Sequence, residues 1–234
     1  MRKLGIIGGM SWVSTEIYYA HINKRVQAKA GAKSSAPLVV ESLDFSSLNQ
    51  LQSDEDWSRA TDTLCEAARN CERAGAAALV IGANSMHRVY DAVTDCVDIP
   101  VIHIADCVGE KMAADGVKKA AILGTRNVMT ESFFRRRLVE HGVDLMPPDM
   151  DIVEQLDHII YDELIVGRAT RDAERKLKSI LTVKQQEGAE AVALACTELA
   201  LVVDVDANVL PIYDSTQIHA DKAAAWILGD AEIG

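Results

Sequence analysis

One cysteine of this chain, Cys196, stands where a thiol could do chemistry. It directly follows the apolar run 191–195 and precedes Thr197 and Glu198, a sequence compatible with the start of a helix. A thiol at a helix N-terminus lies at the positive end of the peptide dipoles, which lowers its pKa and favours the thiolate. A thiolate acts as a nucleophile, a metal ligand or a general base. Metal binding is disfavoured because no second Cys or His stands at ligand spacing, and the alternative to a reactive thiol is a buried, inert cysteine.

The remaining cysteines are expected to be buried and inert. They are Cys65, Cys71, Cys96 and Cys107. The total of five is odd, and none of the cysteines stands in CxxC spacing. We therefore expect a reduced, cytoplasmic protein without disulfides or structural zinc.

The segment around Cys196 resembles an earlier segment of the same chain. Residues 188–199 align with residues 75–86, and each segment opens on Gly-Ala and continues as an apolar run of strand length. Each run closes on a small or thiol residue that is followed by Thr or Asn. In this alignment Ala83 stands where the later copy has Cys196.

A second pair of segments, residues 3–10 and 119–126, matches in the same order along the chain. Two matched pairs indicate two similar α/β halves that face each other, with a site between Ala83 and Cys196. The alternative is chance similarity, because buried strands draw on a narrow set of residues.

The elements that would position these residues alternate between strands and helices. Strands are expected at 4–8, 37–43, 77–82, 100–104, 119–124, 191–195 and 209–213. Helices are expected from Ser14 to Ala30 and at 57–74, 86–93, 131–141, 152–166, 170–187 and 215–228. A further helix is expected to run through Asp106. Such alternation predicts parallel sheets with helices on both faces. We expect two pseudo-symmetric Rossmann-like α/β lobes, one from residues 1–100 with about 208–234 and one from about 101–207, with the active site in the cleft between them.

Polar and glycine-rich segments follow the expected strands, at the edge where ligands bind in such sheets. They are Gly8-Gly9-Met10, Ala83-Asn84-Ser85, Gly124-Thr125 and Cys196-Thr197. The glycine turn offers backbone N–H groups to a carboxylate, and Asn84, Ser85 and Thr125 add further donors. The alternative for these residues is ordinary capping of the following helices. The turn is too short for the GxGxxG fingerprint, since position 13 is Val, so dinucleotide binding is disfavoured.

Composition excludes several classes of function. The 234-residue chain carries a net charge of −11, and its strongest basic run, residues 135–137, lies in a helical pattern that faces solvent. Nucleic-acid binding is therefore disfavoured. No apolar segment approaches the roughly 18–20 residues that span a bilayer. The N-terminus shows no secretory signal, so we expect a cytoplasmic protein that binds no membrane.

Taken together, these motifs resemble the aspartate/glutamate racemase family, and most of all its branch of bacterial aspartate racemases. The resemblance is carried by Gly8-Gly9-Met10-Ser11-Trp12 with Ser14-Thr15, Asn84-Ser85-Met86-His87, His103-Ile104-Ala105-Asp106, Leu123-Gly124-Thr125-Arg126 and Ala195-Cys196-Thr197-Glu198-Leu199. It runs from Leu4 to about Leu228, which is essentially the whole chain.

The resemblance implies an amino-acid racemase that uses neither pyridoxal phosphate, nor any other cofactor, nor a metal. Two α/β lobes would enclose an acidic amino acid, with one acid/base group from each lobe facing opposite sides of Cα, and the enzyme would be a homodimer. Met10 and Gln52 would lie near the substrate. Asn84, Ser85 and Thr197 would hold its α-carboxylate or ammonium group.

For three further residues the resemblance leaves two roles open. Arg168 lies in a segment where relatives contact the side-chain carboxylate, so it either binds the distal carboxylate bidentately or is a surface arginine just past Gly167. His87 and His103 either support proton transfer or are structural histidines.

The chain departs from this pattern at Ala83, where relatives have a catalytic thiol or a threonine. Ala offers no titratable group, and three explanations stay open. The chain is an engineered, inactivated variant, a natural one-thiol racemase, or an enzyme whose reaction needs a single proton delivery, as in the more distant arylmalonate decarboxylase type. A non-catalytic amino-acid-binding protein and an NAD-linked oxidoreductase are the alternatives from other classes.

Overall fold

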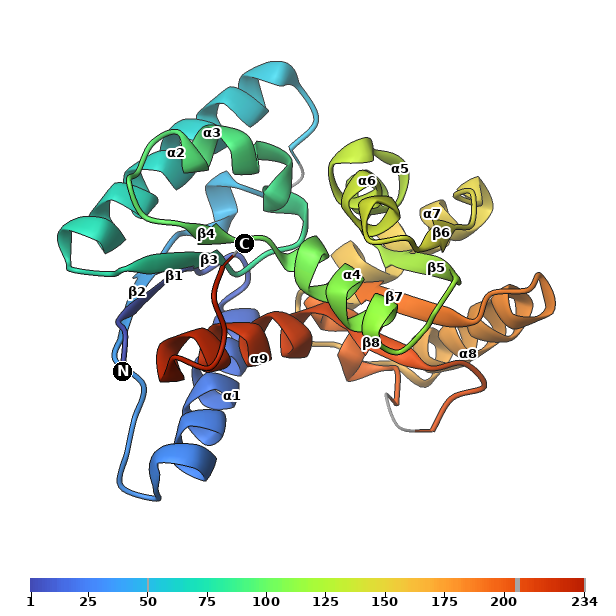
Figure 1. Cartoon of the computed structure of the whole chain (residues 1–234). Coiled ribbons are helices and arrows are strands. Elements are labelled where there is room, and N and C mark those ends of the chain that lie inside the picture. Colours follow the sequence, from blue (N-terminus) through green and yellow to red (C-terminus); the bar gives the residue numbers. More distant parts are fainter. Residues whose placement is uncertain (50, 205–206, 234) are drawn as a thin grey trace. The chain divides into compact units, whose positions relative to one another are not determined.

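The computed structural model describes residues 1–49, 51–204 and 207–233 (Figure 1). The chain divides into two compact units. The first unit comprises Met1–Ile104 and the C-terminal segment from His219, and the second comprises Ala105–Ile218. Within the described residues, no helix is long and apolar enough to cross a membrane.

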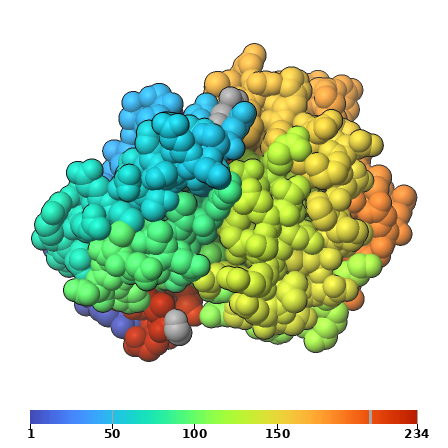
Figure 2. Space-filling model, turned by 90° about the horizontal axis from the view of Figure 1, so that it is seen from above, coloured from blue at the N-terminus to red at the C-terminus, as the bar shows by residue number. Residues whose placement is uncertain are grey.

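The first unit is built on a parallel four-stranded sheet in the order β2-β1-β3-β4. Its strands are β1 (Leu4–Gly8), β2 (Leu38–Ser42), β3 (Ala78–Ile81) and β4 (Val101–Ile102). Its helices are α1 (Trp12–Ala30), α2 (Asp54–Arg73), α3 (Tyr90–Thr94) and most of α9 (Ser215–Leu228), with 3₁₀ turns η1 (Phe45–Ser47) and η2 (Ser85–Val89). Helices α2 and α3 cover one face of this sheet, and α1 and α9 cover the other (Figure 1). Viewed from above, α2 and α3 form the cyan and green surface (Figure 2).

The second unit has a parallel four-stranded sheet in the order β6-β5-β7-β8. Its strands are β5 (Lys119–Gly124), β6 (Asp144–Leu145), β7 (Ala191–Ala195) and β8 (Ile212–Asp214). Its helices are α4 (Ile104–Ala114), α5 (Arg126–Thr130), α6 (Ser132–Glu140), α7 (Met150–Ile159) and α8 (Arg171–Gln186), with a π-helical turn η3 (Ile160–Leu164) and a 3₁₀ turn η4 (Thr197–Leu201). The predicted α/β class with parallel sheets is confirmed.

The internal repeat predicted from the sequence is confirmed by strand order and register. Strands β1 and β5 occupy the same place in their sheets, as do β3 and β7. Leu4 pairs with Ala78 in the first sheet, and Ala120 pairs with Ala191 in the second. These four residues are equivalent in the two sequence alignments, so Ala83 and Cys196 follow equivalent strands.

The helix starts differ from expectation where local side-chain hydrogen bonds decide them. Ser11, not Ser14, caps α1, and its hydroxyl accepts the N–H of Ser14. Ser53 caps α2 in a capping box with Asp56, so this helix begins three residues before the expected Trp57. Such reciprocal bonds satisfy backbone donors that the first helical turn leaves open.

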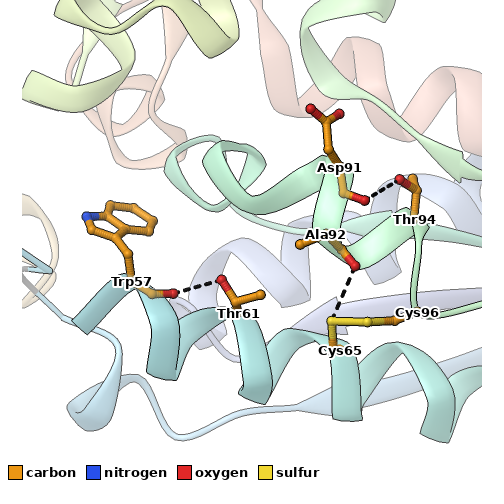
Figure 3. The surroundings of a disulfide bond; sticks show 7 residues. All are labelled: Trp57, Thr61, Cys65, Asp91, Ala92, Thr94 and Cys96. Atoms are coloured by element: carbon orange, nitrogen blue, oxygen red, sulfur yellow. Dashed lines mark hydrogen bonds between the residues drawn. A yellow bond between two sulfur atoms is a disulfide. The ribbon is translucent and has the colours of Figure 1, made fainter. Parts of the chain in front are cut away.

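The expectation that the chain has no disulfide is wrong. Cys65 on α2 and Cys96, which follows α3, are bonded in the first unit (Figure 3). The two residues are 31 positions apart, and the loop that they close contains β3 and the segment Ala83–Ser85. Sequence spacing could not show this pairing, because it depends on how α3 packs against α2.

Removing this bond is expected to lower the free energy of unfolding by about 2–4 kcal/mol, because the disulfide restricts the unfolded chain. The measurement compares urea unfolding of the oxidised protein with that of Cys96→Ser. Cys107→Ser, which changes a cysteine outside this disulfide, is the matched control. Equal midpoints for the oxidised wild type and Cys96→Ser would contradict the prediction.

Candidate functional site

Four of the predicted site residues lie at the carboxyl edge of the first sheet. Strands β1 and β3 are parallel neighbours, so the residues that follow them meet at one edge. Met10 follows β1, and Ala83, Asn84 and Ser85 follow β3. Met10 and Ala83 also belong to one buried apolar cluster. The first unit therefore brings these residues together.

The glycine turn after β1 is held by the protein's own side chains. Gly9 has φ +83°, and a Cβ there would lie 2.1 Å from the carbonyl oxygen of Leu43, so only glycine fits. Its N–H donates to Oγ1 of Thr15 at 2.8 Å. The expectation that this N–H serves a substrate carboxylate is therefore wrong for Gly9, because the N–H is already bonded to Thr15.

Asn84 carries an open acceptor at this edge. The residue is buried, and its Oδ1 has no hydrogen-bond partner among the described residues. A buried polar atom without a partner costs stability, so its retention needs an explanation. An amide oxygen at this place suits a substrate N–H donor such as an ammonium group.

His87 fixes the backbone at position 83. Its Nδ1 donates to the carbonyl oxygen of Ala83 at 2.9 Å, and its Nε2 accepts the N–H of Ile104 at 3.2 Å. The backbone thus sets a neutral imidazole, since Nε2 must be unprotonated to accept. The ring of His103 lies 4.5 Å from that of His87. The structural alternative therefore holds for His87, whose two nitrogens are both bonded to backbone.

His219 completes this buried group of rings and was not singled out from the sequence. Its Nδ1 bonds the hydroxyl of Tyr18 at 2.7 Å, and its Nε2 donates to the carbonyl oxygen of Ile102 at 3.1 Å. Burial lowers the pKa of His219 from 6.5 to about 3. The residue is therefore neutral in the folded protein at neutral pH.

This lowered pKa predicts a loss of stability in acid. Between pH 6.5 and about 3 the unfolded chain binds a proton at His219 that the folded chain does not. The free energy of unfolding should therefore fall by about 2–3 kcal/mol from pH 6.5 to pH 4.5 through this residue. Urea unfolding should show a weaker pH dependence for His219→Gln than for the wild type. The exposed His158→Gln is the control, and an equal slope in His219→Gln and wild type would count against the assignment.

The second sheet gathers a separate set of predicted residues. Thr125 follows β5, and Cys196 and Thr197 follow its parallel neighbour β7. Gly124 allows the two strand ends to approach, since a Cβ there would lie 2.7 Å from the carbonyl oxygen of Ala195. Oγ1 of Thr125 is buried without a hydrogen-bond partner among the described residues. It is the second predicted site residue with an open polar atom.

The thiol of Cys196 is protonated rather than poised as a thiolate. Its Sγ donates to Oε2 of Glu198 at 3.2 Å. Burial, and next the negative charge of Glu198, raises the pKa of Cys196 well above its usual value. The predicted lowering by a helix dipole is wrong, because the following helix is only the five-residue 3₁₀ turn η4. Glu198 is the partner that sequence reasoning missed.

A tyrosine on the π-helical turn also belongs to the surroundings of Cys196. The turn η3, which carries Tyr161, packs against η4. Burial, followed by the charges of Cys196, Asp157 and Glu198, raises the pKa of Tyr161 to about 12. The phenol therefore stays a neutral donor. A π-helical turn gives no sequence signal, although such turns are frequent at functional sites.

Two predicted residues lie in loops rather than at strand ends. The exposed Gln52 precedes α2, and its backbone N–H donates to Oδ2 of Asp56 at 3.2 Å. Arg168 is exposed after η3, and its guanidinium donates to the carbonyl oxygen of Asp162. Their contacts with substrate stay predictions. Among the described residues, no group of three His, Cys, Asp or Glu side chains could hold a metal ion.

Comparison of the sequence with known proteins identifies related racemases. A family model described as Asp/Glu/hydantoin racemase matches residues 7–223. The chain is 22% identical over 229 residues to the broad specificity amino-acid racemase RacX of Bacillus subtilis (strain 168), covering 96% of this chain and 98% of that one.

Two crystal structures resemble this fold over its whole length. One is a candidate Asp/Glu racemase from Yersinia pestis, with a TM-score of 0.89 and 36% identity, covering 97% of this chain and 100% of that one. The other is PH1733, an aspartate racemase homologue from Pyrococcus horikoshii OT3, with a TM-score of 0.84 and 33% identity at the same coverage.

Proposed function

Because the chain belongs to the Asp/Glu/hydantoin racemase family, we propose that it racemises an acidic amino acid, aspartate or glutamate, without a cofactor. The racemases among its relatives support an amino-acid racemase that acts on a small molecule. The observation that carries the finer proposal is the buried thiol of Cys196, which lies at the end of β7 and donates to Glu198 at 3.2 Å. In this proposal Cys196 is the surviving base, and Ala83 replaces the opposing acid/base.

The proposed reaction begins with two proton transfers. The thiol of Cys196 first loses its proton to solvent, and the resulting thiolate removes the Cα proton of the L-enantiomer. The electron pair moves into the α-carboxylate, giving an enediolate whose charge must be stabilised by preorganised donors. The hydroxyls of Ser85, Thr125 and Thr197 are the proposed donors, and Oδ1 of Asn84 is the proposed acceptor for the ammonium group.

The second proton transfer, which completes the inversion, lacks a side-chain donor in this chain. If Cys196 returns the proton, it does so to the face from which it came, and the L-enantiomer is regenerated. Inversion needs a proton on the opposite face, where Ala83 has none to give. Water would supply it slowly. We therefore propose that exchange of the Cα hydrogen is faster than racemisation.

The remaining parts of the proposal rest on the family resemblance. Met10 and Gln52 would border the substrate, and Arg168 would reach the distal carboxylate only by leaving its contact with Asp162. The enzyme would be a homodimer in the cytoplasm, where the Cys65–Cys96 bond is open to reduction. The lobe boundaries expected from the sequence, 1–100 with about 208–234 and about 101–207, stay a prediction.

Ala83 itself favours a second candidate function. With one thiol and no opposing acid/base, the site suits a reaction with a single proton delivery, such as decarboxylation, or binding of an amino acid without turnover. Neither alternative requires racemisation. An inactivated variant would behave in the same way until position 83 is restored.

Hydrogen exchange in D₂O tests the proposal directly. L- and D-aspartate and L- and D-glutamate are incubated with the protein, and the Cα proton signal is followed by NMR beside a chiral assay. We expect the L-enantiomers to lose their Cα signal faster than D-product forms. The rate should rise from pH 7 to beyond pH 9, because the raised pKa of Cys196 limits the thiolate fraction. If none of these four enantiomers exchanged its Cα hydrogen, the proposed enzymatic activity would be refuted.

A further inference from the structure

We propose that the Cys65–Cys96 disulfide is a reversible modification site, at which a small thiol that carries an ammonium group and carboxylates forms a mixed disulfide with Cys96. All the residues concerned belong to the first unit, and the proposal does not depend on racemase activity. Disulfides in a reducing cytoplasm are usually transient, because small thiols and reductases open them. Three features of this disulfide suit it to such an exchange: its access, its leaving group and the charges beside it.

A surface hollow of about 510 Å³ lies beside the disulfide. Both cysteines line it, together with residues of α2 and Ala92 of α3. Its volume falls in the range of about 300–1,000 Å³ that is usual for small-molecule sites. Because the two cysteines are part of its wall, a thiol that binds in the hollow is held next to the bond that it attacks.

The two cysteines differ in access and in what receives them when the bond opens. Cys65 is only 5% exposed, whereas Cys96 is half-buried, so an incoming thiolate reaches Cys96 more readily. Sγ of Cys65 lies 3.4 Å from the carbonyl oxygen of Ala92, within reach of an S–H donor (Figure 3). This carbonyl can accept a hydrogen bond from the thiol that Cys65 becomes on release. Cys65 is therefore the leaving group, and Cys96 is the residue modified.

The wall that α2 contributes to the hollow carries charges of both signs. Asp62, Glu66, Arg69 and Arg73 line it with Cys65, and their spacing of three or four residues places them on one face of the helix. All four charged residues are exposed. The carboxylates come first along the helix and the guanidinium groups follow. A surface of this kind matches a molecule whose ammonium and carboxylate groups lie at different ends.

Arg69 is the cation of this wall that is open to a carboxylate. Arg73 already donates to Oδ1 of Asn70. Arg69 is exposed and makes no hydrogen bond or ion pair with another described residue. A guanidinium group binds a carboxylate through two parallel N–H groups. In the proposed complex Arg69 therefore holds a carboxylate of the bound thiol.

The exchange balances with the small thiol as its only reductant. The thiolate attacks Sγ of Cys96, the bond between Cys65 and Cys96 breaks, and its electron pair leaves on Cys65, which takes a proton from solvent. A second thiolate then attacks the sulfur of the bound molecule, so that Cys96 leaves as a thiolate and is protonated in turn. Two small thiols are oxidised to a small disulfide while the protein disulfide is reduced. The reverse sequence remakes the bond.

The test compares reduced glutathione with its diethyl ester on the oxidised full chain. The ester keeps the thiol and the ammonium group and masks both carboxylates. Samples are quenched with N-ethylmaleimide, and the loss of the disulfide is followed by mass spectrometry. Each rate is divided by the rate of the same thiol with the chain unfolded in urea, which removes differences in thiol reactivity. We expect glutathione to react about 2- to 10-fold faster than the ester on this relative scale.

The net charge of −11 by itself favours the ester, because the ester is the more positive of the two thiols. A faster reaction of glutathione therefore reports a local cation. Arg69→Gln should slow glutathione by about 2- to 5-fold and leave the ester unchanged. Arg59→Gln, which changes an exposed arginine of α2 outside the hollow, is the matched control.

Peptide maps of early samples test which cysteine is modified. Glutathione on Cys96, with N-ethylmaleimide on Cys65, would support the proposal, and glutathione on Cys65 would overturn it. A relative rate of glutathione no greater than that of the ester, or equal rates in Arg69→Gln and Arg59→Gln, would overturn it as well. None of these measurements involves exchange at Cα, so the proposed racemase stands or falls separately.

Discussion

Replacing Ala83 with cysteine is expected to raise the rate of racemisation by about 10²- to 10⁴-fold, the usual contribution of a positioned acid/base. The position is suited to the substitution, because the carbonyl of residue 83 is held by His87 at 2.9 Å. Ala83 also follows the strand equivalent to the one before Cys196. In the proposed reaction, a thiol at position 83 is the second acid/base and gives Cα the proton that inversion needs. A chiral assay of D-aspartate formed from L-aspartate measures the effect.

A second substitution at the same position, Ala83→Ser, is the control. Ala83→Ser adds a hydroxyl of similar size but much weaker acidity, so it should raise the rate far less than Ala83→Cys. A gain of less than about tenfold in Ala83→Cys, with the fold intact, would mean that position 83 is not the missing partner. Exchange without inversion in the wild type and full racemisation in Ala83→Cys would establish that Cys196 removes the Cα proton and that the residue at position 83 returns it.

Replacing Cys196 with alanine is expected to lower Cα exchange on the L-enantiomers by about 10²- to 10⁴-fold. The reason is that Cys196 is the proposed base. In the proposed reaction Glu198 does not itself remove the Cα proton, so it cannot replace the lost thiol. NMR in D₂O measures the loss. Cys107→Ala, which removes another buried thiol outside the disulfide, should leave exchange unchanged. Equal exchange in Cys196→Ala and wild type would exclude this thiol as the base.

Much of the fold was accessible from sequence because the central strands are uniformly apolar. The bounds of β1, β5, β7 and α9 were predicted without error, and the first three of these elements are bounded by glycine or polar residues. The two-residue strand β6 was missed, since so short a run carries no periodicity. Helix α5 begins at Arg126, five residues before the helix expected from 131, and Glu131 interrupts the pattern between α5 and α6.

The sequence predicted only those residues of the candidate site that follow the end of a strand. That rule found Asn84 and Thr125, whose side-chain oxygens have no hydrogen-bond partner among the described residues, but it could not find Glu198 or Tyr161. Their relevance depends on contacts made through tertiary packing. The protonation of Cys196 was predicted wrongly for a physical reason. Burial and a neighbouring carboxylate outweigh the dipole of a short helical turn.

The first unit is discontinuous along the chain, and this limits how the protein can be divided. Its last segment supplies His219, which bonds Tyr18, and Trp226, whose carbonyl accepts from Arg2. A fragment ending at Ile104 would leave the buried hydroxyl of Tyr18 and the carbonyl of Ile102 without His219. Independent expression of the N-terminal half therefore requires the closing helix to be grafted back, for instance by circular permutation.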